Sequence, residues 1–339
     1  MRHNFFWSTI RIVLGCAFCA CLLVACRPGE AGLSHPTGVA TAADGSLYVM
    51  DHIDLKHSRV VHISAQSKIL DTFQPEDPKP GLVSAGWDIA VGPTGNVYYC
   101  NQVSNDDRTV HDGLMSFSPG GEFLTEIGAA DYAVDSSELS AIPYNLDVDN
   151  RGWIYVADFN YNQLRVFNSQ GQLLAQLNAD NVEGFKYSGI GDVAVDDRRD
   201  LLYLTDYFDG KLDQYRLSIQ TDGTIQLKLQ FSVGTFGHGP GEFSFPQYLT
   251  VDEVTGFIYV GDMGNRRILA LDPGGNFVAE FSPPVDEWQV LGLAIGADTS
   301  YPADTQHPGD QTIYAADALN RVIWAFRPDG QFLRKIEVH

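Results

Sequence analysis

Residues 258–268 read Ile-Tyr-Val-Gly-Asp-Met-Gly-Asn-Arg-Arg-Ile, and they contain the pattern that decides the fold. A short apolar segment carries Tyr259, and Asp262 follows three residues later. The same register, with Tyr three residues before Asp or Asn, occurs in Leu47–Asp51, Val97–Asn101, Ile154–Asp158, Leu202–Asp206 and Ile313–Asp317. Six of the 15 Tyr residues therefore occupy one position of a repeat. Self-similarity at this spacing indicates a repeat architecture.

Each Tyr-bearing segment is flanked by further candidate strands. An apolar segment precedes it in every copy: Val39–Thr41, Ile89–Val91, Leu146–Val148, Val193–Val195, Leu249–Val251 and Leu293–Ile295. Tight turns such as Ala43-Asp44-Gly45 join the two and supply the positive φ that hairpins require. A third strand, a second turn and a fourth strand follow.

Four antiparallel strands repeated six times predict an all-β fold, a six-bladed β-propeller of four-stranded antiparallel blades. The physical reason is that one small sheet cannot bury both faces alone, whereas neighbouring blades cover each other. The alternative is an array of β-sandwiches, which does not require the same Tyr register in every unit.

The composition excludes several classes of protein. The chain has 339 residues, of which 44% are hydrophobic, so it buries enough apolar surface to order itself. The 22 Lys and Arg residues are outnumbered by 43 Asp and Glu, which gives a net charge of −21. Such a field repels phosphate backbones, so we expect no nucleic-acid partner. Beyond residue 26 the single Cys is Cys100, which lies in an apolar segment and is expected to be a buried, unreactive thiol.

The first residues have the features of a secretory signal. Arg2 and Arg11 stand in a segment without acidic residues, and the apolar run Ile12–Ala25 follows. The run ends in Leu23-Val24-Ala25-Cys26, which resembles a bacterial lipobox and implies lipid attachment at Cys26. We therefore expect a lipoprotein signal peptide at 1–25, a short tether at 26–34 and the propeller at 35–339. The alternative is an ordinary signal anchor or a cleaved signal without lipid.

The copies resemble the NHL repeat over residues 34–338. The strongest copy is Phe-Gly-His-Gly-Pro-Gly-Glu-Phe at 236–243, followed by Phe245-Pro246 and the segment 258–268. Pro36–Ala40 and Asn320-Arg321-Val322 also match the repeat. The resemblance implies a propeller and leaves the activity open, because a fold does not fix function.

The starts of the inner strands carry the candidate metal site. The repeat places Gly at this position, as in Gly38 and Gly292, but the other copies have Asp88, Asn145, Asp192 and Tyr248. Oxygen-bearing side chains from three consecutive blades are expected to converge near the axis. Ca²⁺ or another divalent cation takes such ligands, so Asp88, Asn145 and Asp192 are the predicted set. The alternative is a water-filled channel lined by small polar residues, or side chains that cap local turns.

This set is similar to the channel metal of the senescence-marker-protein/gluconolactonase and paraoxonase-like hydrolases. The resemblance implies a metal that polarises a lactone or ester carbonyl. Those families also use a Glu from the first blade, where this chain has Gly38. The amidating-lyase relatives of the repeat require a histidine zinc site. Here only His35 precedes an inner strand, and His52, His57, His62, His111, His238 and His307 lie at unrelated positions, so we expect them in surface turns.

The polar residues that end the Tyr-bearing strands form a second set. A carboxylate after a strand accepts backbone N–H bonds of the following turn or pairs with an Arg of the next strand. Because the position repeats in every copy, we expect a structural role. These residues are Asp51, Asn101, Asp158, Asp206, Asp262 and Asp317.

Two functions follow from these features. The first is an exported, lipid-anchored binding or scaffold module, monomeric, that holds a protein or a small ligand on a loop face. Aromatic loop residues such as Tyr132, Tyr144, Phe236 and Tyr301 would build that surface. The second is a divalent-metal-dependent lactonase or esterase with its site at the central channel. In both cases the protein would face the periplasm or the exterior of a bacterial cell.

Overall fold

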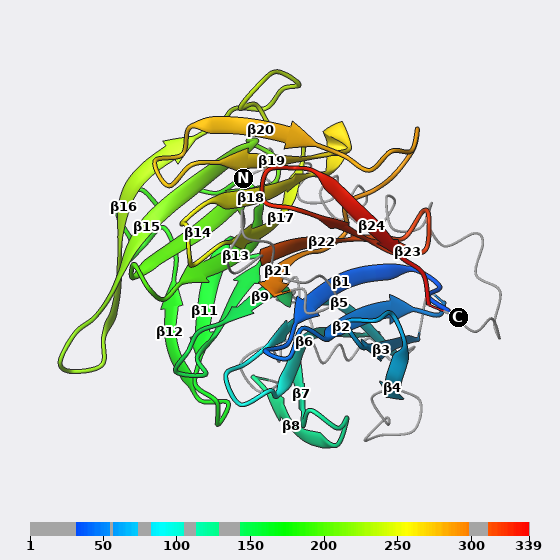
Figure 1. Ribbon diagram of the computed structural model, residues 1–339. Helices are drawn as coiled ribbons and strands as arrows, with labels where there is room; N and C mark the ends of the chain where they lie inside the picture. The colour runs from blue at the N-terminus through cyan, green and yellow to red at the C-terminus, as the bar shows by residue number, and fades with distance from the viewer. Residues whose placement is uncertain are drawn as a thin grey trace.

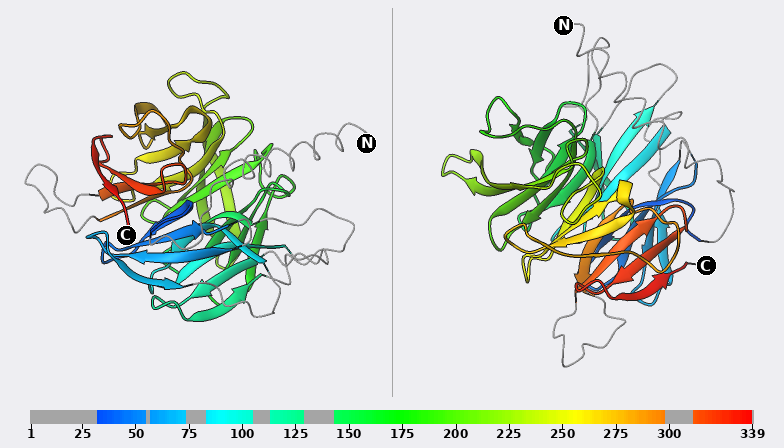
Figure 2. Two further views of the ribbon diagram at one scale, coloured as in Figure 1. Left: turned by 90° about the vertical axis from the view of Figure 1, so that its right-hand side faces the viewer. Right: turned by 90° about the horizontal axis from the view of Figure 1, so that it is seen from above.

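The computed structural model describes residues 32–54, 57–73, 83–104, 113–128, 143–297 and 311–338. Within these residues the chain forms six four-stranded antiparallel sheets arranged as a six-bladed β-propeller (Figures 1 and 2). The predicted fold is therefore confirmed. Four strands that are consecutive in the chain make up each blade, and the first of them is innermost. In Figure 1 the labels β1, β5, β9, β13, β17 and β21 accordingly gather at the centre.

The strands have the following bounds. Blade 1 contains β1 (Pro36–Thr41), β2 (Leu47–His52), β3 (Ser58–Ile63) and β4 (Ile69–Phe73). Blade 2 contains β5 (Val83–Val91), β6 (Val97–Ser104), β7 (Gly113–Phe117) and β8 (Phe123–Ile127). Blade 3 contains β9 (Pro143–Val148), β10 (Ile154–Asp158), β11 (Gln163–Phe167) and β12 (Leu173–Leu177). Blade 4 contains β13 (Ile190–Asp196), β14 (Leu201–Asp206), β15 (Lys211–Ile219) and β16 (Ile225–Val233). Blade 5 contains β17 (Pro246–Val251), β18 (Ile258–Asp262), the 3-10 helix η2 (Met263–Asn265), β19 (Arg267–Leu271) and β20 (Phe277–Phe281). Blade 6 contains β21 (Leu293–Ala297), β22 (Gln311–Asp317), β23 (Val322–Phe326) and β24 (Phe332–Ile336).

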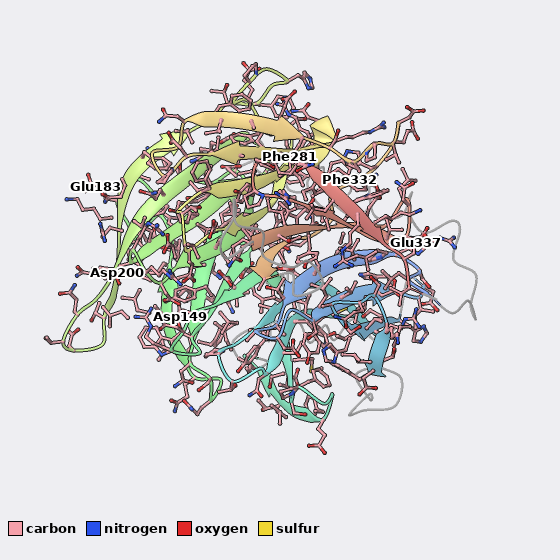
Figure 3. All side chains as sticks on the ribbon, viewed as in Figure 1. Asp149, Glu183, Asp200, Phe281, Phe332 and Glu337 are labelled. Atoms are coloured by element: carbon pink, nitrogen blue, oxygen red, sulfur yellow. The ribbon has the colours of Figure 1, made fainter. Side chains whose placement is uncertain are left out.

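The apolar core lies between the blades. Among the described residues the buried side chains form six clusters, and each cluster is shared by two neighbouring blades. Figure 3 shows one of these interfaces, where Phe281 of blade 5 and Phe332 of blade 6 lie on either side of the same seam. Both rings pack around Phe326, with centroid distances of 5.2 Å and 5.9 Å. Each sheet is thus covered by its neighbours, as the repeat argument requires.

The place of the repeated Tyr in the fold explains why it recurs at the same position of every repeat. In every blade it faces the cluster shared with the next blade, and Tyr155 and Tyr203 are completely buried there. The hydroxyl of Tyr48 donates to the carbonyl of Pro119 in a turn of blade 2, with an O···O distance of 2.9 Å. A buried Tyr needs such a partner for its hydroxyl. One residue type therefore fills the seam and hydrogen-bonds across it.

Among the described strands none is exchanged between the first and last blades to close the ring. Blade 6 instead packs directly on blade 1, where the Thr41 hydroxyl donates to the carbonyl of Ile295 with an O···O distance of 2.9 Å. Leu33, which precedes β1, is buried in the same cluster as Ile336 and Val338 near the C-terminus. Arg59 also hydrogen-bonds the carbonyl of Gly32. The two ends of the described chain thus meet at one seam, and side-chain packing holds that seam together.

Candidate functional site

The inner strands surround a small cavity on the axis. Its volume is about 130 Å³, and its walls come from all six inner strands. Three carboxylates line it, those of Asp88, Asp147 and Asp192. A volume of this size holds a few water molecules, each of which occupies roughly 30 Å³ in the liquid. The cavity is too small for a drug-sized ligand, which needs about 300 Å³ or more.

The three carboxylates join consecutive blades. Asp88 Oδ2 accepts the backbone N–H of Leu146, at an N···O distance of 3.1 Å. Asp192 Oδ2 accepts the N–H of Leu249 in the same way, at 2.6 Å. Asp147 Oδ2 accepts the corresponding N–H of the next inner strand at 2.8 Å. The innermost strand of a blade has an unpaired edge, and these acids satisfy its buried N–H groups.

The electrostatics of the cavity oppose ionisation. Removal from water raises the pKa of Asp88 to about 7, against the opposing effect of its backbone hydrogen bonds. Burial also raises the pKa of Asp192 well above its ordinary value, and the charge of Asp88 adds to the effect. Two ionised carboxylates that are buried close together repel each other. A proton or a cation would relieve that repulsion.

Asn145 occupies a different place from the two acids. It does not line the cavity. Its Nδ2 donates to the carbonyls of Gly191 in blade 4 and Gln247 in blade 5, both at 2.9 Å. Its Oδ1 is buried, and no described residue donates to it. The structure therefore brings Asp88 and Asp192 to one cavity and places Asn145 where it links three blades.

A polar layer joins the starts of the inner strands. The Gln247 side chain donates to the Tyr144 hydroxyl at 2.7 Å and to the Tyr248 hydroxyl at 3.1 Å. Since Tyr144 belongs to blade 3 and Gln247 to blade 5, this hydrogen bond spans the mouth of the channel. The hydrogen bond between Gln247 and Tyr144 could not be predicted from the sequence, because the two residues are 103 positions apart.

The polar residues that end the second strands bind backbone groups. Asp51 Oδ1 accepts the N–H groups of Ser34 and His35, both at 2.7 Å. Asp206 accepts the N–H of Ser188, and Asp262 accepts that of Ser244, so each of these acids holds the segment that leads into its own inner strand. Asp317 accepts the N–H of Gln289. Asp158 accepts a hydrogen bond from the side chain of Gln163. Asn101, at the same position of its repeat, is buried.

The histidines of the described segments are not grouped into a metal site. His35 and His52 are buried at the start of β1 and the end of β2, whereas His57 and His238 are exposed. His111 and His307 lie outside the described residues. Within the part of the chain that the structure describes, no three or more His, Cys, Asp or Glu side chains are grouped so as to hold a metal ion.

A continuous chain of aromatic side chains, here called the aromatic arc, begins next to the polar layer and shares Tyr144 with it. Each inner strand begins, and each second strand ends, at this edge of its blade. Neighbouring rings in the arc have centroids 4.9–6.0 Å apart. The arc consists of Trp87 from blade 2, Tyr144 and Phe159 from blade 3, Tyr207 and Phe208 from blade 4, and Phe245 and Phe236 from the β16–β17 connection.

The rings of the arc are partly exposed to solvent. Six of them are half-buried, and Phe236 at the end is 51% exposed. Gly189 lies under the arc, where a Cβ would come within 2.7 Å of the Phe208 ring and 3.2 Å of the Phe159 ring. Sequence analysis anticipated Tyr144 and Phe236 as surface aromatics. The other five do not share one position of the repeat, so no repeated pattern in the sequence marks them. Tyr132 and Tyr301 lie outside the described residues.

Three earlier predictions concern the ends of the chain and its cysteines. The expected signal peptide and the lipid-bearing Cys26 lie outside the described residues. Cys100 is a free, buried thiol, as expected. In the described segments no helix has the length and apolarity to cross a membrane.

The fold and the cavity define the class of the protein as a six-bladed propeller with a small cavity on its axis. No protein-family model matches the chain, and no curated protein matches its sequence. Its fold is similar to that of solved propellers. A catalytically inactive virginiamycin B lyase from Staphylococcus aureus, solved with quinupristin, is 13% identical and has a TM-score of 0.55, over 92% of this chain and 86% of the lyase. A protein described as a gluconolactonase is 14% identical with a TM-score of 0.55, over 90% of this chain and 92% of that one. A Bacteroides caccae protein of unknown function is 14% identical with a TM-score of 0.53, over 76% and 85% of the two chains. At these identities the likeness concerns the fold.

Proposed function

We propose that this protein is a binding module that holds a small, flat, mainly apolar ligand against the aromatic arc. The observation that carries the proposal is the arc itself, in which three blades and the β16–β17 connection contribute rings to one partly exposed surface. A contiguous exposed apolar surface on a soluble domain marks an interaction site. Aromatic rings stack on flat partners and contribute about 0.5–1.5 kcal/mol per pair beyond the buried area.

The charge of the protein narrows the class of ligand. A net charge of −21 disfavours anionic ligands and favours neutral or cationic ones. Cations also bind over aromatic faces. We therefore propose a neutral or positively charged aromatic compound. We further propose an exported, lipid-anchored protein built from NHL-like repeats, which would present the arc outside the cytoplasm.

Removal of rings from the arc is expected to weaken binding of an aromatic probe. With indole and tryptamine as probes, Trp87→Ala and Phe208→Ala should each raise the Kd by about two- to tenfold, because each removes one stacking partner. Ligand-observed NMR titration measures the change. Phe123→Ala is the matched control, since Phe123 is a 46% exposed ring on the outer strand β8. Equal affinities in all three variants would contradict the proposal.

A second candidate is a metal-dependent lactonase or esterase, and one observation favours it. Asn145 Oδ1 is a buried oxygen without a donor among the described residues, and Asp88 and Asp192 repel each other nearby. These oxygens fit a divalent cation in type and charge. Each carboxylate oxygen that accepts one N–H keeps a second lone pair. When bound, such an ion would polarise a carbonyl group.

Calorimetry would test the cation site. If it is present, Ca²⁺, Mg²⁺ or Mn²⁺ should bind to the wild type, and binding should be lost in Asp88→Ala/Asp192→Ala. Asp180→Asn is the control, because Asp180 is exposed and does not line the cavity. Metal-stimulated hydrolysis of lactones or aryl esters, lost in Asp192→Ala, would favour the enzyme. Absence of binding to the wild type would remove this candidate.

A further inference from the structure

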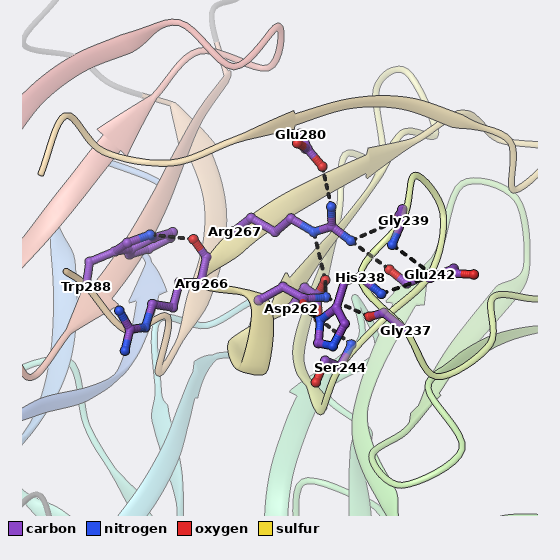
Figure 4. Close-up of polar contacts among 11 residues, drawn as sticks. Gly237, His238, Gly239, Glu242, Ser244, Asp262, Arg266, Arg267, Glu280 and Trp288 are labelled. Carbon is purple, nitrogen blue, oxygen red and sulfur yellow. Dashed lines mark hydrogen bonds and ion pairs between the residues drawn. The ribbon is translucent and has the colours of Figure 1, made fainter. Parts of the chain in front are cut away.

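The connection that ends the aromatic arc is held rigidly by polar contacts (Figure 4). Glu242 Oε2 accepts the backbone N–H groups of His238 and Gly239, at 3.0 Å and 2.8 Å. Arg267 in β19 donates to the carbonyls of Gly239 and Glu242 at 2.8 Å and 2.9 Å, and its Nε donates to Asp262 at 2.9 Å. The backbone on both sides of His238 is therefore fixed to blade 5.

The hydrogen-bond partners of the Asn265 side chain determine the orientation of its amide group. Asn265 Nδ2 donates to the carbonyl of Gly237 at 2.9 Å and to Asp262 Oδ2 at 2.6 Å. Both partners are pure acceptors, so the atom that faces them must be the NH₂ group. The other end of the amide, Oδ1, therefore faces His238 Nδ1, with which it makes a hydrogen bond.

That hydrogen bond determines the tautomer of His238. An amide oxygen only accepts, so Nδ1 must carry the proton. In a neutral imidazole the other nitrogen, Nε2, then has a free lone pair. The His238 side chain is exposed, and no described residue hydrogen-bonds to Nε2. The loop thus presents an acceptor whose direction is set before any ligand arrives.

The acceptor lies at the end of the arc. His238 is two residues from Phe236, whose ring packs on Phe245 with a centroid distance of 5.5 Å. Phe245 in turn packs on Gly264, the neighbour of Asn265, where a Cβ would come within 2.9 Å of the ring. A ligand stacked on these two rings would therefore lie beside the loop that carries His238.

We propose that His238 Nε2 receives a hydrogen bond from the ligand, which is therefore a flat aromatic compound with an N–H or O–H donor at its edge. This inference rests on the proposed binding function of the arc. It explains why the loop orders an exposed imidazole through an amide rather than leaving it free in solvent. An acceptor fixed in advance costs little entropy when the ligand binds.

Blade 6 shows that the histidine is not needed to hold the amide. Asn320 stands at the same repeat position, and its Nδ2 donates to the carbonyl of Glu287 at 2.9 Å and to Asp317 Oδ2 at 2.7 Å. No described histidine faces Asn320. The Asn therefore has its scaffold role in both blades, and His238 is an addition specific to blade 5. Asn320→Ala is accordingly a matched control for Asn265→Ala.

Two measurements test the proposal. Long-range ¹H–¹⁵N NMR of the His238 ring at neutral to mildly basic pH should show the Nδ1–H tautomer in the wild type and in Asn320→Ala, and its loss in Asn265→Ala. In addition, wild-type protein should bind indole about three- to tenfold more tightly than 1-methylindole, which lacks the N–H donor. The ratio of the Kd for 1-methylindole to the Kd for indole should fall to about one in His238→Phe, which keeps an aromatic ring at the position.

The outcomes separate the two proposals. An Nε2–H tautomer in the wild type, or equal binding of indole and 1-methylindole, would overturn the role of His238 while the aromatic arc remains a binding surface. Failure of both probes to bind would overturn the proposed function and the role of His238 with it.

Discussion

Replacement of Gly292 with Ala is expected to lower the free energy of unfolding by about 2–3 kcal/mol, because it overpacks the seam that closes the ring. A Cβ at this position would come within 2.8 Å of the Thr37 carbonyl oxygen and 2.9 Å of the Gly38 Cα. Both are main-chain atoms of blade 1, so neither can rotate away. Since none of the described strands is exchanged between the first and last blades, no strand ladder between them resists the displacement.

Urea denaturation followed by circular dichroism would measure this effect. Gly120→Ala is the matched control: Gly120 lies in an exposed turn, where the nearest atom to an added Cβ is the Ser118 Oγ at 3.9 Å. That variant should remain within about 0.5 kcal/mol of the wild type. A Gly292→Ala protein as stable as the control would mean that blades 1 and 6 can separate at little cost.

The stability of the metal-free protein is expected to fall by about 3 kcal/mol as the pH rises from 4 to 7. In the folded chain burial raises the pKa of Asp88 from 3.8 to about 7. Between these two values the folded state keeps a proton that the unfolded state has released. Folding is therefore favoured at the lower pH, and this contribution is lost as the pH rises through the folded pKa. Burial raises the pKa of Asp192 too, which acts in the same direction.

Denaturation at several pH values in the presence of EDTA would measure how the free energy of unfolding depends on pH. Asp88→Asn should reduce this pH dependence, because the amide keeps an oxygen that accepts the Leu146 N–H and has no proton to lose in this range. The part that remains comes from Asp192 and Asp147, whose pKa values burial also raises. Asp180→Asn, at an exposed position, changes the net charge equally and is the control. A wild-type protein that becomes more stable from pH 4 to pH 7 would contradict the buried, proton-binding environment of Asp88.

The same two acids show how far sequence reasoning reached at the candidate site. Their position at the start of inner strands placed them at the axis, and the structure does bring Asp88 and Asp192 to one cavity. Their bonds to the N–H groups of Leu146 and Leu249 were not predicted, because they depend on how closely neighbouring blades approach. Asn145 was assigned to the same cavity and instead links three blades through two carbonyls.

The sequence by itself determined the number of blades and their strand order. A Tyr at one register in six copies must meet a seam in each copy, and Gly-containing turns leave only short hairpins between strands. These are local patterns, written within about fifty residues of chain. The aromatic arc, the polar layer of Gln247 and Tyr144, and the fixed tautomer of His238 were decided by the tertiary structure alone. Each joins residues from different blades or from different repeat positions, and their proximity follows from the curvature and closure of the ring, which no single repeat encodes.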